Sequence, residues 1–354
     1  MILAWKEIRR NKVRYFLIST IMVAILFLVF FITALSNGLG YADSAAMSNL
    51  KADYVVLNKE ANGVLIKSGL SNKDIQEIEK KVEGDVSSLN VSISTLDRER
   101  KGSVDVVYFT VNKETYGNPL IIEGKDIEEL LDGEVIADES LKKFGYSLNE
   151  KVKDSRTGKE MKIAGFTKDH VYSHMPVIFA DLSMGFQSMY SDTDIYNAVL
   201  VKGADFTIAG YDVQTVQDTV NSMPGYAETQ GSFIVMKTFL IIISVFVSSV
   251  FFYIITIQKV HQLGILKALG ATTVDISKTI LFQVSALTLV GIVVSAFAFY
   301  GIVQVMPEEM PIAFSANMMI WTGILFLVLN MIGAMLSVWK VTKIDPLDAM
   351  GRVE

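Results

Sequence analysis

The stretch FIVMKTFLIIISVFVSSVFFYIITI, residues 233–257, is almost entirely apolar. Its only charged side chain is Lys237, near its start. About 20 predominantly apolar residues suffice to cross the hydrocarbon core of a bilayer. The stretch therefore predicts a transmembrane helix, and the rest of the chain is interpreted around it.

Three further stretches without a charged side chain are long enough to span a membrane, at residues 15–36, 280–305 and 318–339. The chain is 51% hydrophobic yet 20% charged, so apolar and polar residues are segregated along it. A cleaved signal peptide is the alternative for residues 15–36. That run is longer than the roughly 7–15 apolar residues of a signal peptide, and Asn37-Gly-Leu-Gly-Tyr41 is a poor cleavage site. We expect four transmembrane helices.

Lysine and arginine flank these spans unevenly, and the imbalance predicts the orientation. The basic residues near the spans are Lys6, Arg9, Arg10, Lys12 and Arg14, then Lys259, Lys267 and Lys278, then Lys340, Lys343 and Arg352. The loop 306–317 has none. By the positive-inside rule, residues 1–14, the loop 258–279 and the tail 340–354 are cytoplasmic. Residues 37–232 and 306–317 are then outside.

The outside segment 37–232 has the pattern of a folded α/β domain. Ser71 is placed to begin a helix whose apolar residues Ile75, Ile78 and Val82 share one face. The turn at 156–158 predicts a hairpin. We expect strands at 54–57, 63–66, 104–111, 133–137, 151–153, 161–165, 176–180 and 198–201, and helices at 73–82, 139–144 and 211–223. The predicted fold class is an α+β membrane protein, with this mixed α/β extracytoplasmic domain inserted between the first and second of four transmembrane helices.

The loop 258–279 contains GILKALGAT, residues 264–272, which looks like a packed helix. Leu263, Leu266 and Leu269 recur every three residues and form one apolar face. Gly270 is suited to end the helix, and Thr272 with Asp275 matches a capping box that begins the next one. The apolar face could lie on lipid headgroups, on other helices of the chain, or on a cytoplasmic partner.

The residues QKVHQLGILKALGAT, 258–272, resemble the signature of MacB/FtsX-type ABC transporter permeases. Gln262 and Leu263 stand where that signature often has Glu and Ile. The start WKEIRRNK, 5–12, is similar to the family's amphipathic N-terminal helix, which would occupy residues 1–14. The end IDPLDAMGRVE, 344–354, is most like the haem-exporting branch of Gram-positive bacteria, the HrtB type.

This resemblance implies a permease subunit of the cell membrane that forms a homodimer and docks two copies of a separate ATPase. The docking residues it implies are Leu263, Gly264, Ile265, Leu266, Lys267, Leu269 and Gly270. Driven through the helices, such a permease would export haem or a similar amphipathic molecule. The alternative is an FtsX-like mechanotransmitter that regulates an extracytoplasmic hydrolase or lipoprotein release.

Catalytic chemistry is not expected of the chain itself. It contains no G-x-x-x-x-G-K-[ST] phosphate-binding motif, so ATP hydrolysis would belong to the partner. No stretch interleaves basic and aromatic residues in the manner of a nucleic-acid surface. His170 and His174 could form a helical metal-binding pair, but their position between two predicted strands favours a loop. We therefore expect no metal other than the iron of haem.

Haem would be cargo, alongside membrane lipid, and the protein would have no intrinsic cofactor. A porphyrin fits between the outer halves of membrane helices, with its iron on a thioether or carboxylate and its propionates near the interface. The candidates are Met22, Phe30, Phe31, Glu228, Met236 and Lys237. Each has a simpler interpretation, as helix packing, a solvated acid or a lysine that extends to the headgroups. The haem exporters are expected to have a first-span methionine nearer the outer leaflet than Met22.

Overall fold

The structure is a computed structural model that describes residues 12–98, 102–115, 119–184, 195–307 and 310–342. The chain divides into two compact units. One comprises Leu39–Gln230, and the other combines Met1–Gly38 with Gly231–Glu354. The predicted N-terminal helix 1–14 and the tail 340–354 lie largely outside the described residues.

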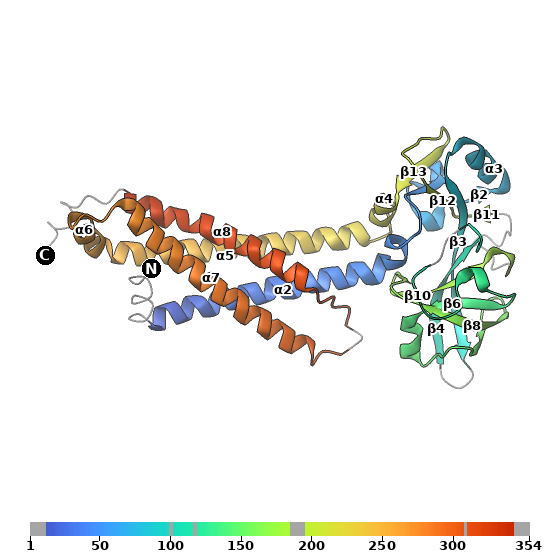
Figure 1. Ribbon diagram of the computed structural model, residues 1–354, viewed down its shortest axis with the longest axis horizontal. Helices are drawn as coiled ribbons and strands as arrows, with labels where there is room; N and C mark the ends of the chain where they lie inside the picture. Colours follow the sequence, from blue (N-terminus) through green and yellow to red (C-terminus); the bar gives the residue numbers. More distant parts are fainter. Residues whose placement is uncertain (1–11, 99–101, 116–118, 185–194, 308–309, 343–354) are drawn as a thin grey trace. The chain divides into compact units, whose positions relative to one another are not determined.

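Four long helices make up most of the second unit (Figure 1). They are α2 (Lys12–Ser48), α5 (Tyr226–Gln258), α7 (Thr273–Val303) and α8 (Ala316–Thr342), with the short α6 (Val260–Ala268) between α5 and α7. All four long helices are apolar and long enough to cross a membrane, which confirms the four predicted spans. Helix α2 continues beyond residue 36, and helix α5 begins before residue 233, so both extend past the predicted ends of their spans.

The core of the helical unit is built on one stripe of α2. Tyr15, Ile18, Met22 and Leu26 recur every three or four residues and are all buried against the other helices. The hydroxyl of Ser295 on α7 donates a hydrogen bond to the Val23 carbonyl of α2 at 2.9 Å. Such direct contacts fix the helices relative to one another, since lipid offers them no hydrophobic driving force.

The Leu39–Gln230 unit contains a mixed sheet of eleven strands, in the order β13-β1-β12-β3-β4-β10-β6-β8-β5, with β7 and β9 paired beside this path. The β10–β4 and β6–β8 pairs are parallel and the others are antiparallel. The strands are β1 (Tyr54–Asn58), β3 (Asp85–Arg98), β4 (Gly102–Val111), β5 (Ile121–Gly124), β6 (Glu134–Asp138), β7 (Lys151–Asp154), β8 (Glu160–Thr167), β9 (Val171–Tyr172), β10 (Met175–Asp181), β12 (Ala198–Lys202) and β13 (Tyr211–Thr215). Strands β2 (Leu70–Ser71) and β11 (Ile195–Tyr196) form a separate pair.

Short helices connect these strands. They are α3 (Asn72–Lys81), α4 (Val216–Asn221) and the 3-10 helices η1 (Lys59–Ala61), η2 (Leu65–Lys67), η3 (Ile127–Glu129), η4 (Glu139–Phe144) and η5 (Leu182–Met184). As predicted, Ser71 caps α3 in a capping box with Asp74, and Ile75 and Ile78 are buried. The hairpin of β7 and β8 is also confirmed.

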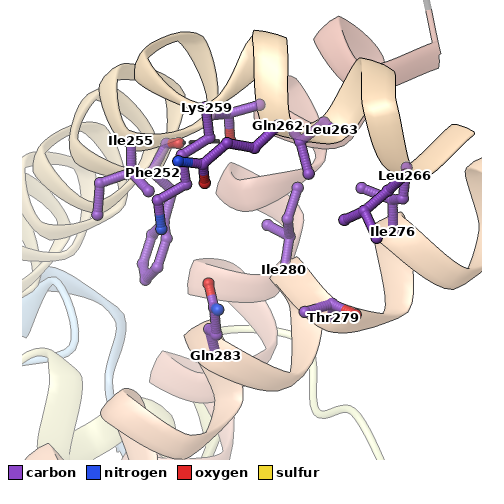
Figure 2. Close-up of a pocket in the computed structure, with 11 residues that line it drawn as sticks. Phe252, Ile255, Lys259, Gln262, Leu263, Leu266, Ile276, Thr279, Ile280 and Gln283 are labelled. Carbon is purple, nitrogen blue, oxygen red and sulfur yellow. Dashed lines mark hydrogen bonds between the residues drawn. The ribbon is translucent and has the colours of Figure 1, made fainter. Parts of the chain in front are cut away.

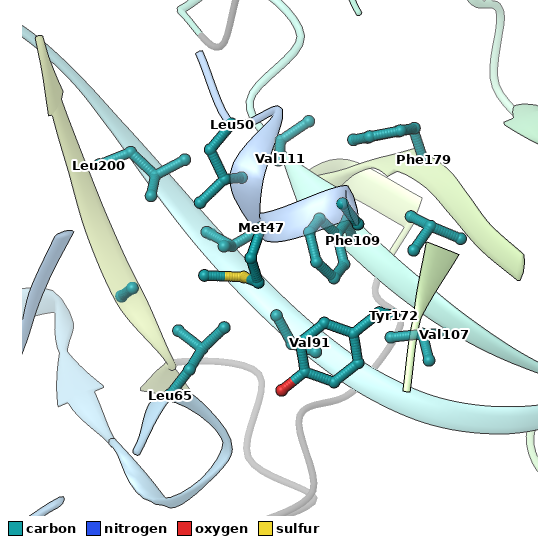
Figure 3. Close-up of a cluster of buried hydrophobic side chains, with 14 of the residues drawn as sticks. Met47, Leu50, Leu65, Val91, Val107, Phe109, Val111, Tyr172, Phe179 and Leu200 are labelled. Atoms are coloured by element: carbon teal, nitrogen blue, oxygen red, sulfur yellow. The ribbon is translucent and has the colours of Figure 1, made fainter. Parts of the chain in front are cut away.

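The middle of the sheet is buried on both faces. Along β10, Val177 and Phe179 join one apolar cluster, whereas Ile178 and Ala180 join another. Successive side chains of a strand point to opposite faces, so the two clusters lie on opposite sides of the sheet. The end of α2 contributes Met47 to the first cluster (Figure 3).

Helix α2 continues to Ser48, so its last turns lie inside the α/β unit, which starts at Leu39. The segment between β8 and β10 holds this helix end. The Tyr41 hydroxyl donates to Asp169, the Asn49 side chain donates to the Asp169 carbonyl at 2.8 Å, and His174 lies 3.1 Å from Asp43. The apolar pattern of residues 15–36 predicted the part of the helix that crosses the hydrocarbon core, but it did not predict where the helix ends.

Two predicted elements are wrong. The strand at 63–66 is replaced by η2, because Asn62 and Gly63 both have positive φ and break the extended path. The helix at 211–223 begins late, because Tyr211–Thr215 pairs with β1 as β13. Thr215 then caps α4, accepting a hydrogen bond from the Asp218 amide at 3.1 Å.

Candidate coupling site at helix α6

Helix α6 is bounded by backbone breaks on both sides. It starts after Lys259, whose φ of −111° and ψ of 8° interrupt the helical path from α5. It ends at Gly270, whose φ of +99° favours glycine, and the Ala271 amide donates to the Leu266 carbonyl at 3.0 Å. The capping box of Thr272 and Asp275 then begins α7. The predicted short helix, its end at Gly270 and the capping box that begins the next helix are therefore confirmed.

A cavity of about 90 Å³ separates α6 from α5 and α7 (Figure 2). Its lining residues are Phe252, Ile255, Thr256, Lys259, Gln262, Leu263, Leu266, Ile276, Thr279, Ile280 and Gln283. Side chains of Lys259 and Gln262 reach from the α5–α6 corner into the space that Gln283 faces from α7. Burial lowers the pKa of Lys259 to about 8, because the ammonium is partly removed from water.

The predicted docking residues fall on different sides of α6. Leu263 and Leu266 line the cavity, so they face the chain's own helices. Gly264 is buried, and Lys267 is half-buried. By contrast, Ile265 is 40% exposed and Leu269 is 79% exposed. Of the apolar side chains in this set, Ile265 and Leu269 are the ones available to a partner.

The haem candidates are also divided by burial. Met22 and Phe30 are buried in the helical core, and Phe31 is half-buried, stacked on Phe27. Met236 is 51% exposed and Lys237 is half-buried. Glu228 is exposed in the first turn of α5, where a carboxylate also interacts favourably with the helix dipole. Met22 and Phe30 pack in the helical core, and a role in haem binding stays a prediction for all six candidates.

A larger groove of about 750 Å³ lies between α5 and α8, lined by Thr238, Ile241, Ile242, Val245, Phe246, Ser249, Leu329, Ile332 and Gly333. The Thr238 hydroxyl donates to the Ile234 carbonyl at 2.8 Å, and the Ser249 hydroxyl donates to the Val245 carbonyl at 2.6 Å. Both hydroxyls thus donate their hydrogen bonds to carbonyls of their own helix. None of these lining residues is a Met, His, Tyr or carboxylate that could hold haem iron.

Residues 234–346 match the FtsX-like permease C-terminal family. The match covers α5, α6, α7 and α8. The chain carries an FtsX-like permease domain. It is 29% identical over 354 residues to a protein of Staphylococcus epidermidis, covering 99% of each chain, and 27% identical over 359 residues to one of Staphylococcus haemolyticus, covering 100% of each. Both relatives are named as the hemin transport system permease protein HrtB.

Among solved structures, the periplasmic region of MacB from Actinobacillus actinomycetemcomitans is similar at 12% identity and a TM-score of 0.35, over 51% of this chain and 97% of that one. The likeness is slight, and the α/β fold rests on the strand pairing described above. The chain thus has four helices long and apolar enough to cross a membrane, a large mixed-sheet domain between the first and second of them, and an FtsX-like permease domain over residues 234–346.

Sequence reasoning missed the polar residues of the α6 cavity. In the sequence, Lys259 contributes only to the predicted orientation, and Gln283 lies within a predicted apolar span. A polar amide within a run of apolar residues is a signal that could have found Gln283, since polar groups inside spans face protein and not lipid. In the structure Gln283 is buried, and its carbonyl oxygen lies 3.4 Å from the Tyr15 hydroxyl.

Proposed function

We propose that the chain is the permease subunit of an ABC exporter that removes haem, or a similar amphipathic molecule, from the membrane. The most direct support is that the chain is similar, over its full length, to relatives that are named as hemin transport permeases. Similarity over 99–100% of both chains includes the α/β unit as well as the permease domain, so it extends beyond the family match.

The energy for export comes from two copies of a separate ATPase docked on α6 of each subunit of a homodimer. The distribution of Lys and Arg supports a cytoplasmic position for α6 and for both termini. Leu39–Gln230 is then outside the cell membrane of a Gram-positive bacterium. The exposed Ile265 and Leu269 form the docking face on α6.

Of the candidate haem contacts, Phe31, Met236 and Lys237 in the helical unit and Glu228 in the α/β unit have exposed surface in the described structure. A thioether or carboxylate can hold the iron, and an ammonium can pair with a propionate. These groups fit haem better than the apolar α5–α8 groove does, since the described residues that line that groove include neither an iron ligand nor a cation.

A haem titration tests this proposal. The chain is purified in detergent with its co-expressed ATPase, and the Soret band is recorded as haem is added. We expect a saturable shift at one haem per dimer, weakened about tenfold or more in Met236→Ala or Glu228→Ala because an iron ligand is lost. Met310→Ala is the matched control, since Met310 is also 51% exposed.

Equal affinity in all of these proteins would remove Met236 and Glu228 from the site. If no saturable shift occurred, export of haem would be contradicted. A stable complex with an extracytoplasmic hydrolase in such a haem-free preparation would favour the FtsX-like mechanotransmitter instead.

A further inference from the structure

The segment between strands β8 and β10 has a backbone geometry that its residue types do not favour. Ser173 and His174 form the two-residue turn between β9 and β10, with φ of +49° and +64°. Positive φ at both residues of such a turn is typical of Asn-Gly and not of Ser-His. Asp169 also has a positive φ, of +64°, so the segment holds three of the five described non-glycine residues with this geometry. Such geometry persists where surrounding contacts hold it, and it is concentrated at switch regions.

The end of helix α2 supplies contacts that hold the turn. The amide of Ser173 donates to the Asp43 carbonyl at 2.8 Å. The amide of His174 donates to the Ala42 carbonyl, also at 2.8 Å, and the Nε2 atom of the same residue lies 3.1 Å from the Asp43 carboxylate. Because both turn amides bond to α2, the geometry of the turn and its contact with the helix depend on each other.

Asp169 forms a second anchor on α2. Its carboxylate accepts a hydrogen bond from the Tyr41 hydroxyl, and its carbonyl accepts one from the Asn49 side chain at 2.8 Å. Tyr41 and Asn49 are about two helical turns apart, or roughly 12 Å along the axis. Residues 168–174 therefore form a strap along the last turns of α2, and all of these contacts lie within the Leu39–Gln230 unit.

The strap is rooted in the core of the sheet but exposed where it holds the helix. His170 is 2% exposed, with its ring 5.1 Å from that of Phe179, and Tyr172 is buried in the cluster of Figure 3. By contrast, Tyr41 is 43% exposed and the His174 side chain is 55% exposed. Water competes for hydrogen bonds at exposed groups, so these contacts can open at little cost while the root stays packed.

A permanent joint is the alternative role for these contacts. Helix α2 is already fixed to the sheet by Met47, which is buried in the same apolar cluster as Tyr172 (Figure 3). The contacts of the strap with Ala42 and Asp43 are additional, and they maintain a turn that serine and histidine disfavour. Opening the strap would relax that turn and return its polar groups to water. The observations therefore favour a contact that opens over a permanent one.

We propose that residues 168–174 are a reversible strap. It closes on α2 through the amides of Ser173 and His174 and the carboxylate of Asp169, and it opens while the sheet stays folded. Helix α2 belongs to both compact units of the chain, so the strap would control how freely the last turns of this helix move against the sheet. The strap requires only this chain, so it stands independently of haem export and of ATPase docking.

Hydrogen exchange of the purified full chain in detergent, resolved to single amides, tests the proposal. The amides of Ser173 and His174 should be less protected than the amide of Val177, which is bonded within the α/β unit. Tyr41→Phe removes the hydroxyl that donates to Asp169. It should lower the protection of the two turn amides roughly fivefold, as expected for the loss of one hydrogen bond, and leave Val177 unchanged.

Tyr211→Phe is the matched control, because it removes a hydroxyl that donates to the Asp74 carboxylate at 2.8 Å elsewhere in the same unit. It should leave the turn amides as protected as in the wild type. Ser173→Gly keeps the backbone amide and suits the positive φ, so it should raise the protection of the His174 amide.

A fall in protection by the same factor at the turn amides and at Val177 would overturn the proposal, because the strap would then open only together with the sheet. Unchanged protection in Tyr41→Phe, or an equal loss in Tyr211→Phe, would do the same. Lower protection of the turn in Ser173→Gly would contradict a strained strap.

Discussion

Gly38 lies where helix α2 meets the connection between α7 and α8. A Cβ atom at this position would lie 1.9 Å from the Pro311 carbonyl oxygen and 2.8 Å from the Ile312 nitrogen. Beside it, the Ala313 amide donates to the Ala34 carbonyl at 3.1 Å. Because the obstructing atoms are backbone, a side chain could be accommodated only by displacing the connection.

Gly38→Ala should therefore lower the stability of the helical unit by about 1–3 kcal/mol, measured as a fall in Tm of the full chain in detergent. Gly301→Ala is the matched control, because Gly301 lies within α7 and a Cβ there would meet nothing within 4 Å. It should keep or slightly raise Tm, since alanine favours a helix over glycine. Equal Tm values for the two variants would contradict the close contact at Gly38.

His170 should make the α/β unit sensitive to acid. Burial lowers the pKa of His170 to about 4, against 6.5 for the free side chain. Between these values the unfolded chain binds the proton and the folded chain does not, so stability is lost as pH falls from about 6.5 towards 4. The loss amounts to about 1.4 kcal/mol per pH unit within that window. Tm measured from pH 7.5 to pH 4.5 should show this slope.

His170→Gln removes the titrating ring and should flatten the pH dependence. The variant leaves Asp138 in place, whose carboxylate accepts from the backbone amide of residue 170 at 2.8 Å. Burial raises the pKa of Asp138, which acts in the opposite direction but equally in both proteins. A slope that is unchanged in His170→Gln would assign the acid sensitivity to another group.

Helix α6 has apolar side chains on two sides, one facing the cavity and one exposed. Leu263 and Leu266 face the cavity, whereas Ile265 and Leu269 face outward. Aspartate at both Ile265 and Leu269 should abolish co-purification of the ATPase and leave Tm unchanged, because a charge there meets water. Leu263→Asp should lower Tm instead, since it places a charge among apolar groups. Retention of the ATPase by the double variant would refute docking on this face.

At the level of elements, the sequence predicted what depends on local pattern. The caps at Ser71, Thr272 and Gly270 are local chemistry and were found where expected. Strand β3 was missed although Leu89, Val91 and Ile93 alternate with polar residues, a pattern that predicts a strand. Its full fourteen residues are held by pairing with β4, β7 and β12. Pairing partners distant in sequence leave no local trace.

Across the whole molecule, the four membrane spans and the inserted α/β domain could be predicted, because hydrocarbon solvation demands long apolar runs. The candidate site could be predicted only in part. Periodicity placed Leu263, Leu266 and Leu269 on one face, but packing turned the first two towards α7 and left Leu269 exposed. The direction of a helix face depends on its neighbours, which a single sequence does not specify.

We propose that ATP hydrolysis by a separate subunit drives haem out of the membrane through this chain. The most direct measurement is transfer of haem from proteoliposomes containing the permease and its ATPase to a haem-binding acceptor in solution. We predict transfer that requires ATP and both subunits and is lost in the Ile265→Asp, Leu269→Asp double variant. Transfer at the same rate without ATP, or with ATP but in the absence of the permease, would contradict ATP-driven export of haem by this chain.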